Sequence, residues 1–209
     1  MRYMTMTTAI LRRTIVFTAA GLALAGAGCS DTVRQGRSAS YLIIDKIEAT
    51  AGSDTTQTGQ LASDVSTKGT AFEDHGFATL SLGLKNIGPE GTAAAPTSNN
   101  FVTVTRYHVS YRRADGRNTP GVDVPYAFDG ATTGTITESE ATFEFVLVRA
   151  QAKLEAPLMN LVGGGGALTI SSLADVTFYG RDQTGNDVQV TGSISVNFAD
   201  WADPGSTPK

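Results

Sequence analysis

The chain contains very little cysteine, histidine and tryptophan. The shortage of cysteine and of histidine each excludes a class of site. Its 209 residues include one cysteine, two histidines and one tryptophan. One cysteine cannot form a disulfide within the chain, and His75 and His108 lie too far apart to match the ligand spacing of a zinc site. We therefore expect no disulfide framework and no metal ligands, and we place His108 on the surface of a sheet.

Sequence motifs of catalysis are also missing. No Gly-x-Ser-x-Gly motif occurs, and the Gly163–Gly166 run lacks the spacing and the lysine of a phosphate-binding loop. Ser193 and Ser195 lie within a predicted strand, where no turn exposes a nucleophile. The sequence therefore predicts a protein that is not an enzyme, with no catalytic residues and no cofactor.

Basic residues are too few and too scattered for a nucleic-acid-binding surface. The chain has 16 basic and 20 acidic residues, and only 17% of its residues are charged. The densest basic group, Arg112 and Arg113 with Arg117 nearby, fits a solvated strand end and turn. Because phosphate contacts need clustered lysine and arginine, we expect no nucleic-acid partner.

The chain has no hydrophobic run long enough to span a membrane. Its one marked apolar run, near the N-terminus, has the pattern of a secretory leader. Arg12 and Arg13 precede an uncharged run over 14–28, which is shorter than the roughly 20 residues that span a bilayer. Small residues over 25–28 lead directly into Cys29. The chain thus resembles a bacterial lipoprotein precursor. This resemblance implies a signal peptide over 1–28 and lipidation of Cys29.

A second cleavage site remains possible within the same leader. Gly26 stands where the lipoprotein pattern prefers a branched aliphatic residue, and Ala25 and Ala27 match an ordinary Ala-x-Ala site. Cleavage there would release a soluble periplasmic or secreted protein with an unpaired thiol at Cys29, whereas acylation would consume that thiol. The start codon is equally open among three methionines: Met1, Met4 and Met6.

The membrane and its face follow from the same resemblance. Ser30 follows the cysteine in place of the aspartate that retains some lipoproteins at the inner membrane, which favours the outer membrane. Residues 29–40 then comprise the lipidated cysteine and a flexible tether, whose last eleven residues span roughly 18 Å as a coil. Without the leader, 13 basic and 20 acidic residues leave a net charge of −7.

Residues 41–200 alternate apolar and polar positions in short segments separated by turn residues, as half-buried strands do. The expected strands are 41–49, 77–85, 101–113, 133–137, 141–148, and a final hairpin of 174–181 and 188–198. The stretch 50–70 is either a long exposed loop or contains a short edge strand near 61–65. A change of phase between Val104 and Tyr107 predicts a β-bulge near Thr105 or Arg106. In the first strand, Leu42 and Ile44 are expected on one face, and Ile43 and Ile47 on the other. Only 151–162 has helical character, which Pro157 limits to a turn or two.

Seven or eight strands without a βαβ rhythm predict two packed antiparallel sheets. The segment 107–112, followed by Ala114-Asp115-Gly116, resembles the middle strand of fibronectin-type-III and related immunoglobulin-like domains. The resemblance implies an all-β, immunoglobulin-like sandwich over 41–200, followed by a C-terminal tail over 201–209. With an odd number of strands, the tail would leave at the pole opposite the lipid.

Loops and exposed aromatic side chains are the candidate binding elements. Asp182 and Asp187 lie around one turn and are the first candidates for calcium, although aspartate also favours turns for local hydrogen-bonding reasons. Tyr179 is expected on the outer face of the last hairpin, and Trp201 follows its final strand. These two residues, together with Tyr41, Tyr107, Tyr111 and Tyr126, could form a platform for a sugar or a protein.

The function that these observations favour is a lipid-anchored protein of the bacterial cell envelope whose β-sandwich acts as a binding or structural module. Its partners would be the membrane, through the lipid, and an unidentified envelope protein or glycan. The first alternative is a soluble secreted or periplasmic protein that binds a ligand, such as a carbohydrate. The second is an envelope hydrolase, which is disfavoured because no nucleophile and base can be paired from the sequence.

Overall fold

A computed structural model describes residues 36–52, 54–86 and 94–201. The predicted signal peptide, Cys29, most of the tether and residues 202–209 lie outside this part of the chain. The sandwich belongs to one compact unit, which begins at Ser38. Within the described residues, no helix has the length and hydropathy needed to cross a bilayer.

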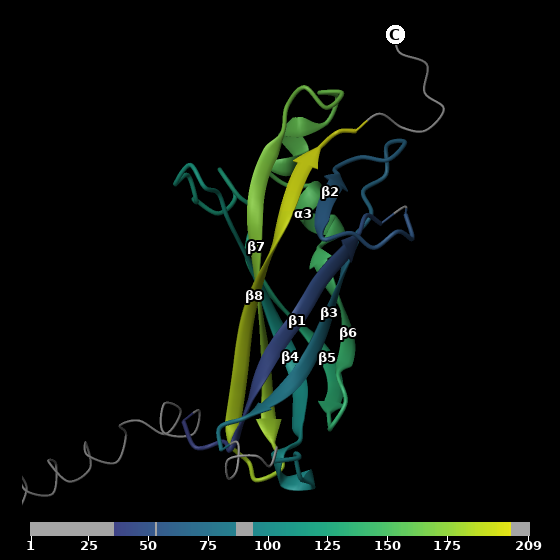
Figure 1. Ribbon diagram of the computed structural model, residues 1–209. Helices are drawn as coiled ribbons and strands as arrows, with labels where there is room; N and C mark the ends of the chain where they lie inside the picture. Colours follow the sequence, from purple (N-terminus) through teal and green to yellow (C-terminus); the bar gives the residue numbers. More distant parts are fainter. Residues whose placement is uncertain (1–35, 53, 87–93, 202–209) are drawn as a thin grey trace, which may run out of the picture. The chain divides into compact units, whose positions relative to one another are not determined.

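Two β-sheets form the domain, which confirms the predicted all-β sandwich (Figure 1). The strands are β1 (Ser40–Thr50), β2 (Gln60–Asp64), β3 (Asp74–Leu84), β4 (Val102–Arg112), β5 (Phe128–Ile136), β6 (Ala141–Val148), β7 (Ile170–Asp182) and β8 (Asp187–Ala199). One sheet has the order β1-β3-β6 and the other β2-β8-β7-β4-β5. The last hairpin, formed by β7 and β8, lies beside the middle strand β4. All pairs are antiparallel except β2 and β8, which run parallel.

The regular strands match the alternating pattern, and the differences lie in the segments without a period. β6 has the predicted bounds, whereas β5 begins five residues earlier than the predicted 133. The predicted helical segment divides at Pro157 into α3 (Ala150–Lys153) and the 3-10 helix η2 (Leu158–Leu161). A second 3-10 helix, η1 (Ser98–Asn100), precedes β4 and had no signal in the sequence.

Two β-bulges decide which side chains face the core. The register of β4 shifts between Val104 and Arg106 against both neighbours, which confirms the predicted bulge. A second shift in β1, between Ile44 and Lys46, was not predicted. It moves Ile47 to the core side with Ile44, while Ile43 is 37% exposed. Placing Ile43 and Ile47 on one face was therefore wrong, because the bulge reverses the alternation.

Aromatic side chains join the two sheets at the centre of the sandwich. Phe145 of β6 packs on Tyr107 of β4 and on Phe178 of β7, with ring centroids 5.3 Å apart in both pairs. The Tyr107 hydroxyl accepts a hydrogen bond from the Val146 backbone N–H at 3.1 Å. Four residues further along β4, the Tyr111 hydroxyl donates to the Leu147 carbonyl at 2.6 Å. The core therefore carries polar links between the sheets as well as apolar packing.

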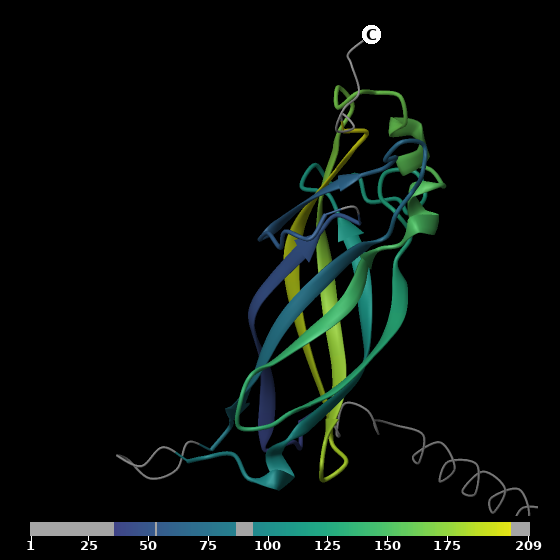
Figure 2. The same cartoon turned by 90° about the vertical axis from the view of Figure 1, so that its right-hand side faces the viewer.

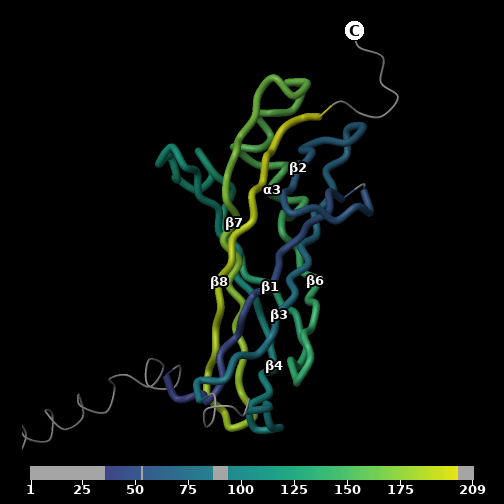
Figure 3. Tube along the Cα trace, viewed as in Figure 1, coloured from purple at the N-terminus to yellow at the C-terminus, as the bar shows by residue number. Residues whose placement is uncertain are grey.

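The sandwich has two distinct ends (Figures 1 and 2). The entry pole holds Ser40, where β1 begins, and the turn between β7 and β8. The distal pole holds Ala199, where β8 ends, together with α3 and η2. The two chain ends of the domain lie at opposite poles, although an even number of strands would normally bring them to the same pole. The reason is that β1 and β2 run in the same direction, one in each sheet (Figure 3).

Candidate binding surface at the distal pole

Exposed apolar side chains concentrate at the distal pole. Ten large hydrophobic residues are exposed within the described chain, and eight of them lie in the loops, helices and chain end at this pole. We call these eight the distal apolar surface: Phe72, Val122, Tyr126, Leu154, Met159, Val162, Leu168 and Trp201. The other two, Tyr41 and Ile43, lie on β1. Such a concentration is typical of an interaction surface, because single exposed hydrophobic residues are normally scattered.

The segment between β6 and β7 contributes half of this surface. Its two short helices bury Ala152, Lys153, Leu158 and Leu161 and leave Leu154 and Met159 more than half exposed. Three glycines of the following run, Gly163, Gly165 and Gly166, have positive φ values, which other residues rarely adopt. The backbone N–H of Gly163 donates to the Asp200 carboxylate. This contact joins the glycine run to the end of β8, beside Trp201.

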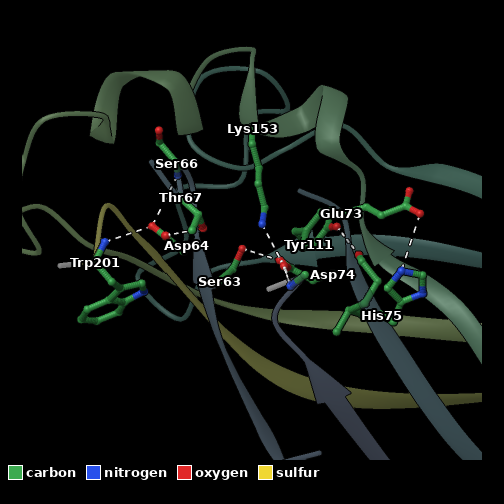
Figure 4. Close-up of polar contacts among 12 residues, drawn as sticks. Ser63, Asp64, Ser66, Thr67, Glu73, Asp74, His75, Tyr111, Lys153 and Trp201 are labelled. Atoms are coloured by element: carbon green, nitrogen blue, oxygen red, sulfur yellow. Dashed lines mark hydrogen bonds and ion pairs between the residues drawn. The ribbon is translucent and has the colours of Figure 1, made fainter. Parts of the chain in front are cut away.

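A buried ion pair holds α3 against the sandwich (Figure 4). Lys153 Nζ lies 2.8 Å from Asp74 Oδ1, and the two side chains are 1% and 0% exposed. Asp74 also accepts hydrogen bonds from the Ser63 hydroxyl at 2.6 Å and from the Gly52 backbone N–H at 2.9 Å. Burial raises the pKa of Asp74, against the opposing effect of Lys153 and these hydrogen bonds. The pair therefore fixes α3 to the start of β3, and the hydrogen bonds of Asp74 extend the contact to the end of β2 and to the residues after β1.

Two smaller polar groups flank this ion pair (Figure 4). His75 Nδ1 lies 3.2 Å from Glu144, and its Nε2 lies 3.6 Å from Glu73. On the other side, Asp64 accepts hydrogen bonds from the Trp201 backbone N–H at 3.1 Å and from the Thr67 hydroxyl at 2.7 Å. Asp64 thus holds the chain beyond β8 in place, so that Trp201 lies at the distal pole, 38% exposed.

Arg149 differs from every other arginine of the sandwich. The five others pair with carboxylates: Arg106 with Asp129, Arg112 with Asp175, Arg113 and Arg117 with Asp115, and Arg181 with Asp187. The half-buried side chain of Arg149 forms no ion pair or hydrogen bond with any described residue, and its Nε is buried without a partner. Its guanidinium lies over the Phe128 ring, with Cζ 4.6 Å from the centroid.

The calcium candidates are occupied by donors of the protein itself. Asp182 is buried at the entry pole and accepts hydrogen bonds from the backbone N–H groups of Thr184 and Asn186, at 3.0 and 2.8 Å. Asp187 pairs with Arg181 at 2.8 Å. No group of three or more histidine, cysteine or acidic residues in the described chain could hold a metal ion. Asp182 therefore has the turn-forming role that was the alternative to calcium binding, and Asp187 forms an ion pair across β7 and β8.

His108 and Tyr179, which the sequence analysis considered as candidates, lie outside the distal apolar surface. His108 is on the outer face of β4, with Nδ1 3.2 Å from Asp129. Tyr179 faces outward as predicted, but the Arg106 guanidinium covers its ring, with Cζ 3.7 Å from the centroid. Tyr179 therefore does not present an open ring face for stacking against a sugar. Cys29, the predicted lipidation site, lies outside the described residues.

A groove lies between β1 and β8, outside the distal apolar surface. It has a volume of about 500 Å³ and is lined mainly by Leu42, Ile43, Ile44, Ile47 and Val190. Its single charged lining residue is Lys46, which pairs with Glu48 at 2.8 Å. Of the hydroxyl groups that line it, Thr191 shares a hydrogen bond with Thr177 at 2.8 Å and Ser193 donates to the Asp175 carboxylate.

Sequence reasoning included Tyr126 and Trp201 among its candidates but missed the other six residues of the distal apolar surface. Leu154, Met159 and Leu168 lie in segments without an apolar period, so nothing in the sequence separates them from buried neighbours such as Leu158. Asp74 and Lys153 are paired across 79 residues, and Arg149 is exceptional only because its neighbours leave it without a partner. No signal in a single sequence identifies either feature.

Comparison with known proteins assigns no family to the chain. No protein-family model matches the chain, and no curated protein matches it significantly.

Proposed function

We propose that the protein is a lipid-anchored component of the bacterial cell envelope whose β-sandwich docks a partner protein at its distal pole. The observation that carries the proposal is the gathering of eight of ten exposed large hydrophobic side chains at one end of the domain. A monomer that binds nothing has no reason to concentrate these residues, because their exposure favours aggregation.

The composition of the pole supports a protein partner. Protein interfaces are enriched in aromatic residues, methionine and arginine. The distal pole combines Tyr126, Trp201 and Met159 with Arg149, which pairs with no residue that the structure describes. The proposed anchor fits the same arrangement. Cys29 precedes the domain by a short tether and Ser40 lies at the entry pole, so a lipid on Cys29 joins the domain at the end opposite the apolar surface.

The anchor is tested by the intact mass of the mature protein extracted from bacterial membranes, for the wild type and a Cys29→Ala variant. We expect the mass of residues 29–209 plus a diacylglyceryl and an acyl group, and the loss of this species in the variant. An unmodified chain that begins at Gly28 and is found in the soluble fraction would support the alternative, a secreted or periplasmic ligand-binding protein.

The docking surface is tested by placing a photo-crosslinking amino acid at Met159 or Leu168 of the full-length protein in its native envelope. Tyr41 is the matched control, because it is exposed to a similar degree on β1. We expect Met159 and Leu168 to crosslink to the same protein and Tyr41 not to. Equal crosslinking from all three positions, or none from the pole, would contradict docking there.

A further inference from the structure

We propose that Arg149 binds a carboxylate of the partner protein and is the polar anchor of the distal docking surface. This inference rests on the proposed function and adds the chemistry that the partner must present: an acidic side chain, or a chain terminus, set among apolar side chains.

Arg149 has no ion-pair or hydrogen-bond partner for its side chain among the described residues. A guanidinium has five N–H donors and no acceptor, and a half-buried cation without a partner is costly. The sandwich supplies a carboxylate to each of its other five arginines, and the Nε of Arg149 is the one buried side-chain polar atom without a hydrogen bond in the described chain. An acidic group supplied on binding would remove this cost.

The position of Arg149 is held rigidly and borders the distal apolar surface. It is the N-cap residue of α3, whose C-cap residue is the exposed Leu154. The buried pair of Lys153 with Asp74 holds the same helix, and the Phe128 ring supports the guanidinium. Tyr126, two residues before Phe128, is 52% exposed. A pre-organised arginine beside aromatic and aliphatic side chains is the composition of an interface hot spot.

The surrounding charges favour a protein carboxylate over a lipid phosphate. Asp54, Glu155 and Asp200 lie at the same pole, and none of the ion pairs in the described chain includes them. These carboxylates would repel an anionic membrane surface, where phosphates are spread over the whole contact. A partner protein can instead place one carboxylate at Arg149 and basic residues around it.

The test uses the full-length protein with a photo-crosslinking amino acid at Leu154, at the other end of α3 from Arg149. The crosslinked segment is identified by mass spectrometry, and the affinity for the purified partner is measured for the wild type, Arg149→Met and Arg112→Met. Arg112 is the matched control, because it is exposed and already paired with Asp175. Methionine keeps the apolar contact with Phe128 and removes the charge.

We expect the segment to contain an acidic side chain or a chain terminus, and Arg149→Met to weaken binding by about tenfold or more. Arg112→Met should change it less than about twofold, because an exposed pair contributes little. Arg149→Glu combined with lysine at the partner's acidic position should restore binding. The melting temperature of Arg149→Met should not fall, because the lost charge pairs with none of the described residues.

Each opposite result is informative. Unchanged affinity for Arg149→Met, with binding lost in Leu154→Ser and Leu168→Ser, would overturn the role of Arg149 and leave docking at the pole intact. Crosslinking to phospholipid would overturn the choice of a protein carboxylate. No crosslinking from Leu154, Met159 or Leu168 would overturn the proposed function itself.

Discussion

Asp182 closes the turn between β7 and β8 at the entry pole. Burial of the carboxyl raises its pKa, but hydrogen bonds from Asn186 and Thr184, together with one from Ser38, outweigh this effect and hold the pKa at about 2. Ser38 lies at the start of the domain, so one carboxylate connects the first described residues of the sandwich to its last hairpin. The turn-forming alternative weighed from the sequence therefore has a specific structural role.

This pKa predicts a pH dependence of stability. The carboxyl has a lower pKa in the folded chain, about 2, than its ordinary value of 3.8, so it stabilises the fold above the ordinary value. That contribution, about 2 kcal/mol, is lost as the pH falls from 4 toward 2. We expect Asp182→Asn to unfold more easily than the wild type at pH 7, with the difference shrinking at low pH. Urea denaturation at several pH values measures it, and a difference that does not vary with pH would contradict the assignment.

The buried pair of Lys153 and Asp74 predicts strong coupling between two residues. Lys153→Met leaves Asp74 buried without its cation, which costs about 3–5 kcal/mol of unfolding free energy. Adding Asp74→Asn to that variant should recover most of the loss, because no charge is then buried. A double-mutant cycle by chemical denaturation measures the coupling. The exposed Lys46 is the control, and Lys46→Met should have little effect. Equal losses in the single and double variants would show that the pair does not act as a unit.

At the scale of the element, the bulge of β4 was predictable and the glycine facing it was not. A change of phase between Val104 and Tyr107 is visible in the sequence, because side chains of a strand alternate with a period of two. Gly180 of β7 pairs with Val104 beside this bulge. A Cβ atom on Gly180 would lie 2.7 Å from the Thr103 carbonyl oxygen and 2.9 Å from Val102 Cγ1. The close approach depends on the pairing of two distant strands, so the sequence does not reveal it.

We therefore expect Gly180→Ala to destabilise the domain by about 1–3 kcal/mol, because the obstacle includes backbone that cannot move aside cheaply. Gly59 is the matched control, since nothing lies within 4 Å of its Cβ position. Gly59→Ala should leave the melting temperature unchanged or slightly higher. Thermal unfolding followed by circular dichroism compares the two variants. A Gly180→Ala variant as stable as Gly59→Ala would mean that β4 and β7 can separate at the bulge without cost.

At the scale of the whole domain, the sequence predicts the layers and not the surface. Strand count, spacing and the lack of a βαβ rhythm are properties of the alternating segments, and they predicted two packed sheets. The distal apolar surface is built from segments without a period, such as η2 and the glycine run, whose side-chain directions depend on contacts distant in sequence. The parallel pairing of β2 with β8 is equally long-range, because nothing in a five-residue strand selects its neighbour.

The opposite placement of the domain's two ends has a mechanical consequence. Under the proposed function, a pull between the anchored entry pole and a load at the distal pole would act along β1 and β8, the strands at which the chain enters and leaves the sandwich. Hydrogen bonds between strands are perpendicular to that direction, so the pull loads many of them together in shear. An arrangement with both ends at one pole would open the same bonds one after another. The topology of this domain therefore suits a component that transmits tension.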